Sequence, residues 1–95
     1  MKEVIINLNG KTLTGYEITM QNAVLVFVTA DKGFVMCGYL NMETAEKLGD
    51  AACMVRGVKT VDDLLNAKIV EMTSKAKQFG IEMGMTGREA LEKLV

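Results

Sequence analysis

The sequence has 95 residues, of which 49% are apolar and 24% charged, and its net charge is −1. This length and composition predict one globular domain spanning residues 1–95. Two tyrosines and three phenylalanines, with no basic stripe around them, do not form a nucleic-acid surface. No run approaches the ~20 apolar residues of a membrane span, and the N-terminus lacks the features of a signal peptide. We therefore expect a cytoplasmic protein with neither nucleic-acid nor membrane partners.

Four segments in the first forty residues have the alternating or β-branched pattern of strands. Three turn sequences separate them: Asn9-Gly10, Gln21-Asn22 and Asp31-Lys32-Gly33, the last ending in a residue free to adopt positive φ. The pattern predicts an antiparallel meander. Its expected strands are Val4–Leu8, Lys11–Met20, Val24–Ala30 and Phe34–Leu40.

The rest of the chain is mostly helical in pattern, with short strands expected at Ala51–Val55 and Ile69–Met72. Residues typical of helix starts precede four segments: Asn41, Thr60, Thr73 or Ser74, and Thr86. The side chains expected to face the core are Met42, Ala45, Leu48, Val61, Leu64, Leu65, Ala76, Phe79, Ala90, Leu91 and Leu94. The predicted fold is α+β, a mainly antiparallel sheet of about five strands packed with three to four short helices.

Two expected strands, Val24–Ala30 and Phe34–Leu40, are almost continuously apolar. A strand with one wet face alternates, so these two are expected to be covered on both faces. Few residues remain for the second face once the helices cover the first. We therefore expect a homo-oligomer in which another copy covers it; the alternative is that the helices divide between the two faces. The eight methionines fit either core packing or a soft binding surface.

Cys37 is the one candidate catalytic residue. It is expected late in a central strand, just before Gly38, where a ligand can approach the backbone. A reactive thiolate needs a neighbouring cation, a helix N-terminus or a general base, and the sequence has no histidine. Arg56 or Arg88 would have to activate it. The alternative is a buried, inert thiol, and both cysteines are expected to be free in a reducing compartment.

Two helix starts carry basic residues and are candidate anion sites. Arg56, Gly57, Lys59 and Thr60 lead into one helix, where free backbone N–H groups favour phosphate or carboxylate. Thr86, Gly87 and Arg88 lead into the last helix, and Arg88 opposes the helix dipole there. The alternative is that each threonine simply caps its helix.

Metal and cofactor sites are not expected. Two cysteines sixteen positions apart, without histidine, do not form a zinc site, and Asp31, Asp62 and Asp63 are explained as turn or helix-start residues.

Three runs resemble motifs of the YunC-like family of small bacterial and archaeal proteins of unknown function. They are Gly33-Phe34-Val35-Met36-Cys37-Gly38, then Gly57 to Leu65, and then Gly84 to Leu91. Their order and spacing agree from about residue 10 to the C-terminus. The resemblance implies one compact α+β domain and brings no established activity, substrate or cofactor. The chain differs at Lys68, where the family tends to have proline, and over the shorter stretch Asn41–Val55.

The leading hypothesis is a homo-oligomeric, non-enzymatic module that binds a small anionic metabolite or a protein partner. It rests on the two apolar strands and the two basic helix starts. The alternative is an enzyme that uses Cys37 as a nucleophile or redox thiol, activated by Arg56 or Arg88.

Overall fold

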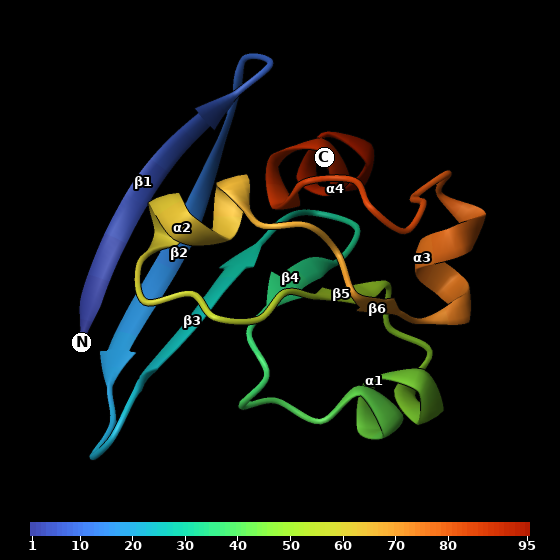
Figure 1. The fold of residues 1–95 in the computed structure, drawn as a ribbon. Coiled ribbons are helices and arrows are strands. Elements are labelled where there is room, and N and C mark those ends of the chain that lie inside the picture. Colours follow the sequence, from blue (N-terminus) through green and yellow to red (C-terminus); the bar gives the residue numbers. More distant parts are fainter.

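The computed structural model describes residues 1–95 as a six-stranded sheet with four short helices, an α+β fold (Figure 1). The strands lie in chain order, and every neighbouring pair is antiparallel except β4 and β5, which are parallel. The strands are β1 Lys2–Leu8, β2 Lys11–Thr19, β3 Val24–Thr29, β4 Phe34–Met36, β5 Ala52–Met54 and β6 Glu71–Met72. The helices are α1 Met42–Leu48, α2 Val61–Asn66, α3 Ser74–Gln78 and α4 Gly87–Leu94. None of these helices is long and apolar enough to cross a membrane.

The predicted meander is confirmed, with one strand much shorter than expected. The β1–β2 connection is the Asn9-Gly10 hairpin, where both residues have positive φ. β4 ends at Met36 rather than Leu40, because the chain turns away after Cys37 and leaves Tyr39 half exposed. The chain then crosses over through α1 and returns as β5, parallel to β4. A parallel neighbour requires a crossover of this kind.

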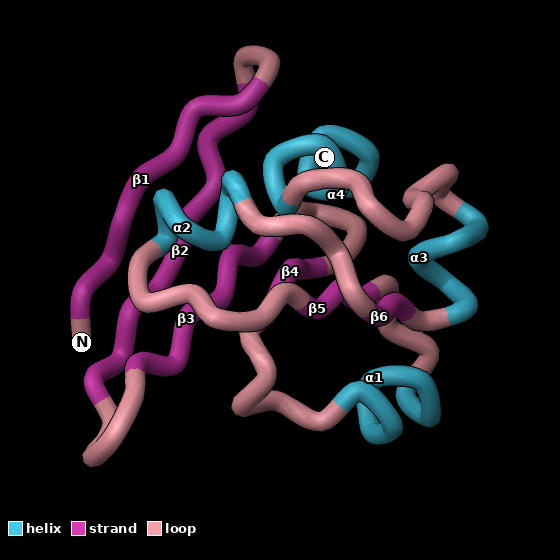
Figure 2. Tube along the Cα trace, viewed as in Figure 1, coloured by secondary structure: helices cyan, strands magenta, loops and turns pink.

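The main core lies between the sheet and the three helices α2, α3 and α4 (Figures 1 and 2). β3 and β4 contribute Val26, Val28 and Val35, which are fully buried beneath α2 and α4. The helix residues that complete it are Val61, Leu64, Leu65, Ala76, Ala90, Leu91 and Leu94, all predicted to face the core. Burial of these side chains, at about 25 cal/mol per Å² of apolar surface, is the main stabilising contribution to the fold.

The opposite face of the sheet is covered only in part. α1 packs there on β4 and β5, where Met36, Ala45, Ala52 and Met54 form a second, smaller core. The prediction that Leu48 points inward is wrong, since its side chain is 71% exposed. No helix covers the corresponding face of β1–β3, which we call the open face. Its residues are Ile5, Thr14, Tyr16, Ile18, Leu25 and Phe27.

The four helices begin at the predicted caps. Asn41, Thr60, Thr73 and Thr86 each accept a hydrogen bond from a backbone N–H in the first turn, and Thr86 with Glu89 completes the capping box. The start of α3 has an additional partner from α1: Ser74 donates to the Glu46 carboxylate through both its amide and its hydroxyl. The bond from the hydroxyl lowers the pKa of Glu46 the most, and the bond from the amide lowers it further. These contacts join α1 to α3 at the end of the sheet formed by β5 and β6.

Gly33 is required for a reason other than the positive φ suggested by its turn. Its φ is not positive. A Cβ atom at this position would overlap the carbonyl oxygen of Ala51, which accepts a hydrogen bond from the amide of Phe34. Close approach of two backbones at the β4–β5 pairing therefore excludes any side chain here.

We predict that Gly33→Ala destabilises the fold by about 2–3 kcal/mol, because the added methyl group forces the β4–β5 backbones apart. Urea unfolding followed by circular dichroism measures the change. Gly38→Ala is the matched control, since a Cβ there meets only Arg56 Cγ at 3.9 Å. Equal stability of the two variants would contradict this account of Gly33.

Candidate functional site

Cys37 lies one residue beyond β4 and remains paired with β3. Its amide donates to the carbonyl oxygen of Val26 at 3.0 Å, and its Sγ accepts a hydrogen bond from the Val26 amide at 3.3 Å. The side chain is 5% exposed. The thiol is thus held against β3 by the backbone of its neighbour, at the end of the strand where the chain turns away.

A mostly apolar pocket of about 290 Å³ opens beside Cys37. Its other walls are Ala23 and Val24 at the start of β3, and Gly38 and Tyr39 after β4. The shortness of β4 creates this pocket, because the turn that follows Cys37 leaves the start of β3 paired with β2 alone. The pocket has two side chains with a potential nucleophile, the Cys37 thiol and the Tyr39 hydroxyl.

Parallel pairing of β4 with β5 sets Arg56 next to Gly38, with the Arg56 Cγ at 3.9 Å from the position of a Gly38 Cβ. The Arg56 guanidinium itself donates to the Glu71 carboxylate of β6 at 2.8 Å. Gly57, at φ +74°, then turns the chain toward α2. Arg56 and Lys59, two of the cations predicted for the site, therefore come soon after β5 in the chain. Arg56 is already paired with Glu71.

Lys59 contributes to a second, neighbouring pocket of about 330 Å³. This pocket is formed by the β2–β3 turn, residues 19–22, and shares Ala23 and Val24 with the Cys37 pocket. Lys59 makes no ion pair in the structure. Cys37, Arg56 and Lys59 thus lie at the same end of the sheet, around the start of β3.

The start of α2 is filled by side chains of the protein itself. The Glu17 carboxylate accepts from the amide of Val61 at 2.7 Å, and Thr60 Oγ1 accepts from the amide of Asp63 at 3.0 Å. Asp63 in turn accepts from the amide of Lys59 at 3.1 Å. These carboxylates take the positions at the positive end of the helix that an external anion would need.

Sequence reasoning did not identify Glu17. The signal was present in β2, where Leu13, Gly15 and Glu17 share the face that is buried against α2. A carboxylate on the same strand face as buried residues requires a hydrogen-bond donor or a cation beside it. Gly15 also makes room for the helix, because a Cβ there would lie 2.7 Å from a methyl group of Val61.

The start of α4 lies at the other end of α2 from Thr60. The Gly87 amide donates to the carbonyl oxygen of Ala67, the C-cap of α2, at 2.8 Å. A Cβ on Gly87 would overlap the Leu64 carbonyl oxygen, so this glycine allows the two helices to touch. Thr86 is used in the capping box, and Arg88 is exposed. The structure does not bring Thr86, Gly87 and Arg88 together with Cys37.

The two free cysteines lie in different environments. Cys53 is fully buried in β5, and burial raises the pKa of its thiol to about 12. Cys37 borders a pocket. Although β4 and β5 are neighbours, Cys53 pairs with Val35 rather than Cys37.

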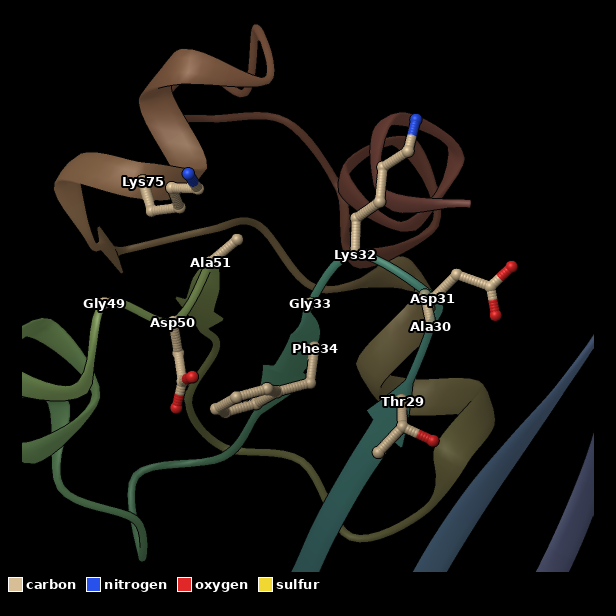
Figure 3. A pocket seen from close by; sticks show the side chains of 10 residues that line it. All are labelled: Thr29, Ala30, Asp31, Lys32, Gly33, Phe34, Gly49, Asp50, Ala51 and Lys75. Carbon is tan, nitrogen blue, oxygen red and sulfur yellow. The ribbon is translucent and has the colours of Figure 1, made fainter.

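Another pocket, of about 320 Å³, lies between the β3–β4 turn and the β5 start (Figure 3). Its charged side chains do not converge. Asp31 points outward (Figure 3). Its carboxylate pairs with Lys11, and the Lys32 ammonium lies over the ring of Phe79. Asp50 points away from Lys75 in the same view. No group of three or more His, Cys, Asp or Glu side chains is placed to hold a metal ion.

We predict that Glu17→Ala lowers the free energy of unfolding by about 1–2 kcal/mol, because the Val61 amide loses its acceptor. Glu17→Gln retains an acceptor oxygen and is expected to recover part of the loss. Chemical denaturation gives both values. Glu82→Ala serves as control, because Glu82 is exposed and its side chain makes no hydrogen bond or ion pair. A Glu17→Ala variant as stable as Glu82→Ala would rule out the capping role.

We also predict selective thiol reactivity in the folded protein. Below its pKa of about 12, the Cys53 thiol is neutral and poorly nucleophilic, and burial blocks reagents. Iodoacetamide should therefore label the Cys53→Ser variant, which retains Cys37, and leave folded Cys37→Ser unlabelled until denaturant is added. Mass spectrometry reads the outcome. Labelling of Cys53 in the folded chain would contradict the burial described here.

Comparison with known proteins identifies relatives over nearly the full chain. The model for the "Domain of unknown function (DUF1805)" matches residues 36–94. The "Uncharacterized protein YunC" of Bacillus subtilis is 34% identical over 94 residues, covering 95% of this chain and 93% of that protein.

A solved structure shows the same fold. The protein of unknown function TA1206 from Thermoplasma acidophilum is 44% identical and superimposes with a TM-score of 0.94, covering 99% of this chain and 92% of that one. The structural similarity includes β1–β3, which lie outside the residues that the family model matches. The chain is similar to YunC over nearly its full length, and it belongs to the DUF1805 family.

Proposed function

We propose that this domain is a non-enzymatic binding module that self-associates and holds a small anionic ligand at the start of β3. The observation that carries the ligand assignment is the pair of adjoining pockets there, one bordered by Cys37 and the other by Lys59. They share Ala23 and Val24, so one ligand can extend across both.

The lining of the two pockets indicates the ligand's chemistry. The Cys37 pocket is apolar on most sides and suits a hydrocarbon portion. The lining of the neighbouring pocket includes Thr19, Gln21, Asn22 and Lys59, and the Lys59 ammonium has no partner in the protein. A small carboxylate or phosphate ester with an apolar group fits this combination. The α2 start contributes no free amide at Val61 or Asp63, so the side chain of Lys59 would supply the charge.

Binding is favoured over catalysis by what surrounds the thiol. Cys37 Sγ accepts from a backbone amide, and the Arg56 guanidinium donates to Glu71. Arg88 lies at the far end of α2. Neither cation proposed to activate Cys37 therefore contacts the thiol, and the chain has no histidine to act as its base.

The second candidate function, an enzyme with Cys37 as nucleophile or redox thiol, is favoured by one observation. Cys37 borders a pocket, whereas the other cysteine is sealed in the sheet. Rapid alkylation of Cys37 with a thiol pKa well below the usual range would support this function. A thiol that titrates in the ordinary range would leave it without its activated nucleophile.

We predict that a panel of small carboxylates and phosphates contains compounds that raise the melting temperature. A ligand at one hundred times its Kd stabilises by about 2.7 kcal/mol, which corresponds to roughly 10 °C or more in a domain of this size. Differential scanning fluorimetry measures the shift. Lys59→Gln should abolish it, because the only unpaired cation of the site is removed.

Lys75→Gln is the matched control, because Lys75 lines the separate pocket of Figure 3. It should leave the shift unchanged. The absence of any shift across the panel would contradict the anionic ligand. A shift abolished by Lys75→Gln and retained by Lys59→Gln would move the site to the other pocket.

A further inference from the structure

A small cavity lies between α1 and the sheet, and we call it the α1 pocket. Its volume is about 240 Å³. The apolar walls come from β4, from the turn that follows β4 and from α1: Phe34, Met36, Leu40, Ala45 and Leu48. Met36 and Ala45 are buried in the small core beneath α1, whereas Leu48 is 71% exposed. A buried apolar floor with an open rim is typical of a small-molecule site.

Asp50 is the only ionisable residue that lines the α1 pocket. Its main chain is fixed, because its amide donates to the Ala45 carbonyl oxygen at 3.0 Å and its carbonyl oxygen accepts from the Thr73 hydroxyl at 2.7 Å. The residue is partly buried, yet its carboxylate makes no ion pair. A partly buried carboxylate without a cation or donor beside it is destabilising. No contact within the fold accounts for an acid at this position.

The position of Asp50 relative to α1 also favours a cation. The carboxylates of Glu17, Glu46 and Glu89 accept from backbone amides at helix starts, where negative charge is stabilised. Asp50 instead follows the C-terminal end of α1, which ends at Leu48. Positive charge is stabilised at that end of a helix. A cation beside Asp50 would therefore interact favourably with both the carboxylate and the helix end.

An aromatic ring lies at the same end of the α1 pocket. Phe34 and Asp50 are the two residues that this pocket shares with the pocket of Figure 3, so they form the boundary between the two cavities. Figure 3 shows the Asp50 side chain directed away from Lys75 and extending on the same side as the Phe34 ring. The face of an aromatic ring attracts a cation. A positively charged group at this boundary can contact the carboxylate and the ring together.

The lining of the α1 pocket restricts the kind of cation. Ca²⁺ and Mg²⁺ require several oxygen ligands, and Asp50 is the only carboxylate of the pocket. An ammonium group needs one carboxylate, and an apolar body attached to it can pack against Met36, Leu40 and Leu48. The volume is about eight times the ~30 Å³ of a water molecule in the liquid. The ligand therefore has on the order of eight non-hydrogen atoms.

We propose that the α1 pocket binds a small primary amine with an apolar body. Its ammonium group pairs with Asp50 beside the Phe34 ring, and its apolar body lies along the inner side of α1. None of the residues that line this pocket lines the pockets beside Cys37 and Lys59. The amine site is therefore independent of the anionic ligand in the proposed function, and either can fail without the other.

NMR titration of the protein with benzylamine tests the proposal. Benzylamine has the required size and is protonated at neutral pH. We expect saturable shifts of the methyl signals of Met36, Leu40 and Leu48, with a Kd on the order of 1 mM. Benzyl alcohol has the same shape without the charge and should bind at least about tenfold more weakly. Benzoate should not bind, because its carboxylate would face that of Asp50.

Two variants and one matched control locate the ammonium group. Asp50→Asn should weaken benzylamine at least about tenfold and leave the protein folded by circular dichroism, since the carboxylate makes no ion pair. Leu48→Ser should weaken it about threefold, because part of the apolar rim is lost. Glu43→Gln is the control and should change nothing. Glu43 is an exposed acid of α1 that does not line the pocket.

The absence of saturable shifts with benzylamine would overturn the proposal. Equal affinity for benzyl alcohol would reveal an apolar pocket without a cation site and would also overturn it. Equal weakening by Glu43→Gln and Asp50→Asn would show a general effect of surface charge and would exclude direct pairing with Asp50. Shifts confined to residues around Lys59 would place the amine elsewhere and contradict the α1 pocket.

Discussion

Burial of Val26, Val28 and Val35 beneath α2 and α4 is the interaction on which the rest of the structure depends. It draws three of the four short helices to one face of the sheet, because a chain of this length has only one large core to build. The crossover between β4 and β5 leaves a single helix, α1, for the opposite face, and α1 covers only β4 and β5. The apolar residues of the open face are the part of the sheet that the chain itself does not cover.

The starts of these helices are also satisfied by side chains of the chain itself. Each of the three helices on the main core has a carboxylate at its start: Glu17 at α2, Glu46 at α3 and Glu89 at α4. These carboxylates satisfy backbone amides and interact favourably with the helix dipoles. They also tie β2 to α2 and α1 to α3 across long separations in sequence. Lys59, beside the start of β3, lines a pocket and is left without an ion pair.

Local patterns predicted much of the fold. Asn9-Gly10 and the four capping residues are short-range signals, and each is found where its chemistry requires it. Leu48 and the end of β4 were mispredicted because both depend on what packs against them. The candidate site was less predictable for the same reason. Arg56 and Lys59 do lie near Cys37, but only the parallel β4–β5 pairing brings them there, and Glu17 reaches α2 from a strand forty-four residues earlier. Thr86 with Arg88, and Thr60 with Arg56, are each a threonine and a basic residue at a helix start. In the structure these two helix starts lie at opposite ends of α2.

The proposed self-association would cover the open face with another copy of the chain. Methyl NMR with a soluble paramagnetic probe tests it most directly, because the probe attenuates only methyl groups that solvent reaches. As protein concentration rises, the methyl signals of Ile5, Ile18 and Leu25 should become protected, while Met83 and Val70 remain attenuated. Attenuation of Ile5 and Ile18 that stays equal to that of Met83 at every concentration would contradict the claim.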